Sequence, residues 1–152
     1  MLENVRSMHN VGSVFRTGDA LGISGIYLIG YTPVPPHRDI QKTALGATET
    51  VPWKHFATTE EALTELRENG YKIAAAEQAH GATPLPDFRP STSEKLALFL
   101  GNEVEGVSDA VLAAADICIE IPQFGEKHSF NISVAAGIIG WEIVRKLRDF
   151  RS

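Results

Sequence analysis

The sequence predicts an α/β fold, a mostly parallel sheet flanked by helices, in a single domain over residues 1–152. Short apolar, β-branched runs alternate with longer segments of helical period, which is the pattern of βαβ units. The chain has 152 residues, 43% of them hydrophobic and 22% charged, which is the usual size and make-up of one domain. A domain of this length buries roughly 68–70% of its unfolded surface. One core is therefore sufficient without disulfides, and the single cysteine, Cys118, could not form one within the chain.

Four apolar runs predict the strands of this sheet, and three of them are short and apolar enough to be buried on both faces. They are residues 25–30, 72–76, 96–100 and 117–121, and a weaker strand is expected near residues 50–53. Between the first and the weak strand, residues 31–37 hold Pro33, Pro35 and Pro36. We expect a stiff exposed loop there, because proline interrupts regular structure.

Four segments of helical period predict the helices, namely residues 11–21, 59–69, 109–114 and 131–150. The second helix has clear end signals. Thr58 precedes two acids that would lie in the first turn, and Gly70 stands where a glycine would end the helix.

The final predicted helix has an unusually wide apolar surface. Its three- and four-residue steps predict one buried face, made by Ile132, Ala135, Ala136, Ile139, Ile143 and Leu147. Val134, Ile138 and Trp141 extend the apolar surface beyond what one sheet face requires. A thick core within one chain or a second burial surface, such as a subunit interface, explains this width, and we favour the interface.

Charge is unevenly distributed along the chain. The net charge is −5, but residues 58–126 hold thirteen acidic and four basic side chains, whereas both ends carry a small positive charge. A polyanion could therefore dock where the two ends meet, with the acidic middle facing water; a solvated mixed-charge surface is the alternative. No apolar run approaches the ~18–20 residues that span a bilayer. The first residues lack the apolar stretch of a signal peptide, so we expect a cytoplasmic protein.

Three polar clusters interrupt this pattern. The first places Asn10 near a helix start and Arg16 under two turns later. A helix cap plus a surface arginine would explain this pair, but a permanently charged arginine also suits a phosphate or a developing oxyanion. The second, residues 101–106, follows an apolar strand, where open α/β sheets bind ligands. Its Glu103 could accept hydrogen bonds or attract a cation; a turn with solvated acids is the alternative.

The third cluster joins the last predicted strand to the final helix and places Ser129 and Asn131 at the helix start. Capping accounts for only one of these side chains, so together they predict a polar pocket floor beside the second cluster. His128 is interpreted as a loop histidine. The sequence fits neither G-x-G-x-x-G nor the P-loop pattern, and no Cys/His spacing suggests zinc, so no metal is expected.

In this order and spacing, the clusters resemble the three signature motifs of the SpoU (TrmH-like) RNA 2′-O-ribose methyltransferases, a branch of the SPOUT superfamily. The resemblance covers residues 10–135, nearly the whole chain. It rests on Asn10-x-Gly12-x-x-x-Arg16, on Leu100-Gly101-Asn102-Glu103-x-x-Gly106, and on Ile121-Pro122-x-x-Gly125 with Ser129-Phe130-Asn131-x-Ser133-Val134-Ala135. Phe130 departs from the commoner leucine, which matters little where family members use mainly the backbone.

This resemblance implies a SPOUT fold, in which the C-terminal segment is threaded into a deep trefoil knot, a rare exception to the rule against knots. It implies that S-adenosyl-L-methionine is bound, largely by backbone, near Ala76, Leu100, Gly101, Ile121 and Phe130. It also implies a homodimer that pairs through the first and last helices, with the site near the subunit interface.

The implied activity is methylation of a ribose 2′-hydroxyl in structured RNA, with tRNA favoured over rRNA. Arg16 would stabilise the oxyanion, since a guanidinium is a poor base, and the general base is left unassigned. Asn10, Glu103, Ser129 and Asn131 would fix the ribose, the loops and one another. Because the first motif starts so early, no appended RNA-binding domain is expected. The alternatives are a non-catalytic RNA- or S-adenosylmethionine-binding module of the same fold and a small-molecule α/β enzyme.

Overall fold

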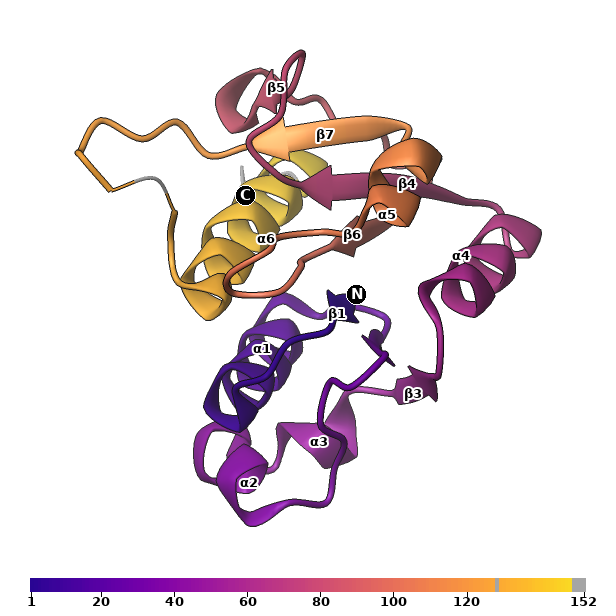
Figure 1. Ribbon diagram of the computed structural model, residues 1–152, viewed down its shortest axis with the longest axis vertical. Coiled ribbons are helices and arrows are strands. Elements are labelled where there is room, and N and C mark those ends of the chain that lie inside the picture. Colours follow the sequence, from indigo (N-terminus) through magenta and orange to yellow (C-terminus); the bar gives the residue numbers. More distant parts are fainter. Residues whose placement is uncertain (128, 149–152) are drawn as a thin grey trace.

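The computed structural model describes residues 1–127 and 129–148, and its named strands pair only in parallel (Figure 1). The strands are β1 (Leu2–Glu3), β2 (Ile26–Ile29), β3 (Trp53–Phe56), β4 (Tyr71–Ala76), β5 (Thr83–Pro84), β6 (Lys95–Phe99) and β7 (Ile117–Glu120). They pair in the orders β1-β2-β3 and β5-β7-β4-β6. The predicted α/β class and the mostly parallel sheet are therefore confirmed.

A short contact joins the two groups of strands. Leu2 forms a parallel bridge with Leu100, which directly follows β6. The N–H of Glu3 donates to the carbonyl of Leu100 at 3.0 Å, and the N–H of Leu100 donates to the carbonyl of Met1 at 2.9 Å. The carboxyl ends of the strands therefore lie along one edge, which is where open parallel sheets bind ligands.

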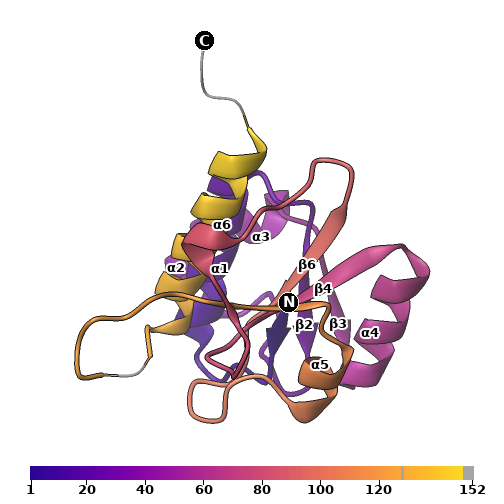
Figure 2. The same ribbon diagram turned by 90° about the horizontal axis from the view of Figure 1, so that it is seen from above.

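Helices cover both faces of the sheet (Figure 2). They are α1 (Met8–Leu21), α2 (Arg38–Ala44), α3 (Ala47–Thr50), α4 (Thr59–Glu68), α5 (Asp109–Ala114) and α6 (Ile132–Leu147), with the 3-10 turn η1 (Leu85–Asp87). Helices α1, α2 and α6 lie on one side, and α4 and α5 lie on the other. No helix in the described part of the chain is long and apolar enough to cross a membrane.

Each face of the sheet is buried in its own apolar cluster. Phe15 and Leu28 belong to the cluster on the α1 side, and Leu66, Ile73 and Phe99 belong to the cluster on the α4 side. All five side chains are at most 1% exposed. Strands covered on both faces need nearly continuous apolar residues, as β4 and β6 have. This packing fixes the strand ends, and with them the loops that follow.

Helix α6 has a buried face and an exposed apolar one. Ile132, Ala136 and Ile139 are buried, whereas Val134 is 48% and Trp141 is 52% exposed. The outward side chains are not covered by a thick core of this chain, so that explanation of the wide apolar surface is wrong for them. The helix ends at Leu147, and the part of the predicted helix at positions 149–150 lies outside the described residues.

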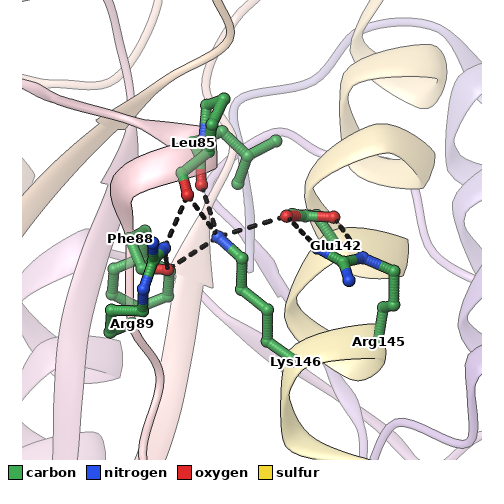
Figure 3. A network of polar contacts seen from close by, with 7 residues as sticks. Leu85, Phe88, Arg89, Glu142, Arg145 and Lys146 are labelled. Carbon is green, nitrogen blue, oxygen red and sulfur yellow. Dashed lines mark hydrogen bonds and ion pairs between the residues drawn. The ribbon is translucent and has the colours of Figure 1, made fainter. Parts of the chain in front are cut away.

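Lys146 connects the last turns of α6 to η1 through hydrogen bonds (Figure 3). Its ammonium forms an ion pair with Glu142 at 3.1 Å. It also donates at 2.7 to 3.0 Å to three backbone carbonyls, those of Leu85, Pro86 and Phe88. Glu142 accepts two hydrogen bonds from Arg145, both of 2.8 Å, and these bonds are the largest cause that lowers the pKa of Glu142 to about 2. The segment that follows β4 is thereby held against α6.

The differences from the predicted elements are confined to short segments and helix starts. The sequence pattern does not predict β1, α2, α3, β5 or η1, because each is too short to show a period. The weak strand expected near residues 50–53 is displaced: α3 occupies residues 47–50, and β3 begins at Trp53. Helix α1 begins at Met8, three residues early, because Ser7 caps it and accepts a hydrogen bond from the N–H of Asn10 at 3.1 Å.

Candidate functional site

Two of the polar clusters meet where Glu103 contacts the start of α1. The carboxylate of Glu103 accepts hydrogen bonds from the N–H groups of Arg6 and Ser7, both at 3.2 Å, and from the Asn10 amide at 3.5 Å. Partial desolvation opposes ionisation of Glu103, but its backbone donors and the Asn10 amide outweigh this, so its pKa lies below the ordinary value. Glu103 is therefore ionised at neutral pH beside the positive end of a helix dipole.

Asn10 also connects to the third cluster. The Asn131 amide donates to the side-chain oxygen of Asn10 at 3.2 Å. The side-chain oxygen of Asn131 accepts from the N–H of Ser133 at 2.9 Å and from the N–H of Val134 at 3.4 Å, so Asn131 is the N-cap of α6. Glu103, Asn10 and Asn131 thus form one hydrogen-bonded series that joins all three clusters. Capping by Asn10 itself, the structural alternative, is wrong, because Ser7 takes that position.

A pocket lies beside this series, between the ends of β4 and β7 and the start of α6. Its volume is about 140 Å³. Its lining includes four residues singled out from the sequence, Ala76, Ile121, Ser129 and Phe130. Because Asn131 supplies the cap of α6, the polar Ser129 is left to the pocket, as the third cluster predicts. His128 lies outside the described residues.

Leu100 and Gly101, also expected near a cofactor, lie apart from the lining of this pocket. Leu100 is 6% exposed and pairs with Leu2 in the core. Gly101 closes the loop tightly, because a Cβ there would lie 2.1 Å from the carbonyl carbon of Gly106. Asn102 and Gly106 exchange backbone hydrogen bonds of 2.9 Å across this loop. Cofactor binding by Leu100 and Gly101 stays a prediction.

Arg16 is separated from the hydrogen-bonded series within one chain. It lies in an open groove of about 470 Å³ between α1 and α2, together with Ser13, Lys42 and Thr43. Six helical residues advance the chain ~9 Å and turn it by roughly 240°, so Arg16 faces away from Asn10. Within residues 1–127 and 129–148, Arg16 forms no hydrogen bond or ion pair with the other predicted catalytic residues.

Asn102 and Glu77 are site residues for which the sequence predicts no individual role. Asn102 is 8% exposed, and its amide donates to the carbonyl of Asn4 at 2.9 Å and to the hydroxyl of Tyr31 at 2.8 Å. Glu77 directly follows β4 and lines the pocket. Their position in the sequence could have indicated them, since both are polar residues just beyond the carboxyl end of an apolar strand.

Two other features bear on what the site can bind. Among the residues that the structure describes, no group of three His, Cys, Asp or Glu side chains is placed to hold a metal ion. A larger cavity of about 340 Å³ extends from the amino edge of the sheet, beside Gly25, Trp53 and Leu96, to Leu100. Its lining is mostly apolar and contains none of the predicted catalytic side chains. The polar chemistry is therefore concentrated at the carboxyl edge.

The class that this geometry defines is a parallel α/β domain whose polar loops meet in one site at the carboxyl edge of the sheet. Among known families of this class, the SpoU rRNA Methylase family matches residues 1–141 of the chain. The chain belongs to this family.

Individual relatives agree with this assignment. A protein of Staphylococcus aureus (strain COL), described as of the TrmH family of tRNA/rRNA methyltransferases, is 34% identical over 149 residues, which are 98% of this chain and 59% of the relative. The AdoMet-bound rRNA methyltransferase structure from Sinorhizobium meliloti gives a TM-score of 0.90 at 31% identity, covering 97% of this chain and 56% of that one. A structure from work on the 2-OH methylation of C/U34 on tRNA gives 0.83 at 27% identity, covering 95% and 92%. The chain therefore spans about three fifths of the curated relative.

Proposed function

We propose that this protein is an RNA methyltransferase that transfers a methyl group from S-adenosyl-L-methionine to a ribose 2′-hydroxyl of structured RNA. The observation that carries the proposal is the hydrogen-bonded series of Glu103, Asn10 and Asn131 beside the pocket that Ser129 lines. Family membership supports it, as does the AdoMet bound to the Sinorhizobium meliloti structure.

The lining of the pocket fits the proposed cofactor. Ile121 and Phe130 offer apolar surface for a purine ring, and backbone at Ala76 and Ile121 lies at the strand ends. Leu100 and Gly101 would support the cofactor from the neighbouring loop. When bound, S-adenosyl-L-methionine supplies an electrophilic methyl group. The protein must align that group with the ribose oxygen and stabilise the charge that develops there.

The residues of the series would position the RNA ribose and the loops around it. Glu103 is ionised and already oriented by α1, so it can accept hydrogen bonds from sugar hydroxyls. Asn10, Ser129 and Asn131 offer amide and hydroxyl groups in the same place. Arg16 would hold the neighbouring phosphate and stabilise the 2′-oxygen as its proton leaves, because its charge is permanent.

A homodimer would complete this site. Arg16 lines a different groove and is not part of the pocket of its own chain, so we assign it to the pocket of a second copy. Pairing through α1 and α6 would also cover the exposed apolar side chains of Val134 and Trp141. An apolar patch of this kind is typical of subunit interfaces.

We further propose that the chain acts as one SPOUT methyltransferase domain and that it works in the cytoplasm. Its C-terminal segment would form the trefoil knot of the SPOUT fold, which would press the loop of residues 121–131 against the loop of residues 101–106. The similarity to the Sinorhizobium meliloti structure supports this arrangement. A tRNA substrate is favoured over rRNA. The solved structure from work on C/U34 of tRNA has a chain of similar length, and this protein covers 92% of it.

The test is methyl transfer from labelled cofactor to total RNA, followed by mapping of ribose methylation in RNA from cells with and without this gene. We expect label in alkali-resistant 2′-O-methylated nucleotides of the tRNA fraction. Cofactor binding without transfer to any RNA would indicate the non-catalytic module instead. Label found only in rRNA would overturn the tRNA preference, and label on bases would overturn the ribose specificity.

A further inference from the structure

The lining of the pocket includes two acidic residues that the proposed reaction does not use. Glu77 directly follows β4 and Glu120 ends β7, and both line the pocket. The two strands lie side by side (Figure 1), and the N–H of Glu77 donates to the carbonyl of Ile119 at 3.1 Å. In the described ranges 1–127 and 129–148, neither carboxylate forms an ion pair with a lysine or arginine.

The carboxylate of Glu77 is held in a fixed place. One oxygen accepts a hydrogen bond from the N–H of Val107 at 3.2 Å, and the other accepts from the N–H of Gln78 at 3.2 Å. Gly106 leaves room for it: a Cβ at this position, where φ is +73°, would lie 2.2 Å from the nearer Glu77 oxygen. Because each carboxylate oxygen can accept more than one hydrogen bond, Glu77 keeps acceptor capacity after joining the two loops.

We infer that Glu77, assisted by Glu120, makes the pocket prefer the positively charged cofactor over its demethylated product. S-adenosylmethionine carries a sulfonium and an ammonium against one carboxylate, so its net charge is positive. Its product S-adenosylhomocysteine has lost the sulfonium charge and is neutral overall. A carboxylate attracts the charged form more strongly, and the attraction is larger in a partly desolvated pocket than in water.

This inference deepens the proposed function, because it concerns the ligand preference of the same pocket. Methyl transfer removes the charge to which the two carboxylates respond. The product is then held less tightly than the cofactor that must replace it. Glu77 and Glu120 would therefore favour the exchange that starts the next cycle.

The test is calorimetric titration of the full chain, without RNA, with S-adenosylmethionine and separately with S-adenosylhomocysteine. In Glu77→Gln we expect the Kd for S-adenosylmethionine to rise roughly tenfold and the Kd for the product to change less than about threefold. Glu120→Gln should shift the ratio of the two Kd values in the same direction by a smaller factor. The matched control is Glu105→Gln, an exposed carboxylate in the loop next to Glu77 but outside the lining of the pocket, which should leave both values unchanged.

The inference would be overturned if Glu77→Gln weakened the binding of both ligands by the same factor and Glu120→Gln left the ratio of the two Kd values unchanged. These side chains would then shape the pocket without distinguishing the charge of the ligand. If Glu77→Gln disturbs the loop at Val107, the Glu120→Gln ratio decides alone. Absence of binding of either ligand to the wild-type chain would overturn the cofactor assignment as well. Because the titration contains no RNA, a failure of ribose methylation leaves its result intact.

Discussion

Replacement of Gly12 by alanine should destabilise this protein, although it removes a glycine from the interior of a helix. A Cβ at position 12 would lie 2.0 Å from the hydroxyl oxygen of Thr43 and 2.2 Å from the carbonyl oxygen of Ile40. The Ile40 carbonyl is backbone of α2, and the Thr43 hydroxyl is held by a 2.9 Å hydrogen bond to the carbonyl of His9. Neither neighbour can yield without moving α2 away from α1.

Two opposing contributions set the size of the effect. Alanine stabilises a helix interior by about 0.5–1 kcal/mol relative to glycine, whereas overpacking costs about 1–3 kcal/mol. Because the overlap at Gly12 includes a backbone atom far inside van der Waals contact, the upper part of that range applies. The net expectation is a loss of about 1–2 kcal/mol, which for a chain of this length lowers Tm by roughly 2–8 °C.

Urea unfolding of Gly12→Ala and of a matched control, Gly137→Ala, measures this difference. Among the residues that the structure describes, a Cβ at Gly137 meets only the methyl group of Thr17, at 3.9 Å, which is ordinary contact. Gly137→Ala should therefore gain about 0.5–1 kcal/mol from helix propensity alone. The two variants should shift the urea midpoint in opposite directions with unchanged m-values. A Gly12→Ala protein as stable as wild type, or equal losses in both variants, would refute the steric argument.

Three further outcomes are expected. Arg16→Ala should nearly abolish turnover while leaving cofactor affinity close to the wild-type value, measured by single-turnover transfer and calorimetry; unchanged turnover would remove Arg16 from the mechanism. Asn131→Ala should lower cofactor binding and turnover together and cost about 1 kcal/mol of stability, because it deletes the N-cap of α6; full activity with intact binding would contradict its assignment. The pKa of Glu142 is lowered to about 2 in the folded chain, so its contribution to stability is present above the ordinary value of 4.5 and is lost as pH falls from about 5 towards 2. Acid titration of unfolding should therefore be shallower in Glu142→Gln, and identical profiles would exclude this contribution.

Elements with local end signals could be predicted from the sequence, and elements that depend on distant partners could not. The predicted start of α4 is confirmed and its end lies one residue earlier, at Glu68, because Thr58 accepts a hydrogen bond from the N–H of Glu61 at 3.3 Å and Gly70 has a φ of +78°. Both signals lie within a few residues of the helix. In contrast, β1 exists only because Leu2 pairs with β2 on one side and with Leu100 on the other, and nothing near residue 2 indicates this.

The site was predictable to a similar extent. The positions of Glu103 and Asn131 after apolar strands indicated a shared edge, and the structure places both side chains in contact with Asn10. The position of Arg16 could have been anticipated better, because six residues along a helix turn its side chain away from that of Asn10. The role inferred for Glu77 depends on the room left by Gly106, which no pattern in the sequence reveals.

The hydrogen bond between Asn10 and Asn131 spans 121 residues of sequence. Asn131 is therefore synthesised 121 residues after Asn10, and a fragment that ends before residue 131 cannot form this bond. The proposed site can therefore form only after both segments have been made, so its assembly belongs to the last steps of folding rather than to the early ones.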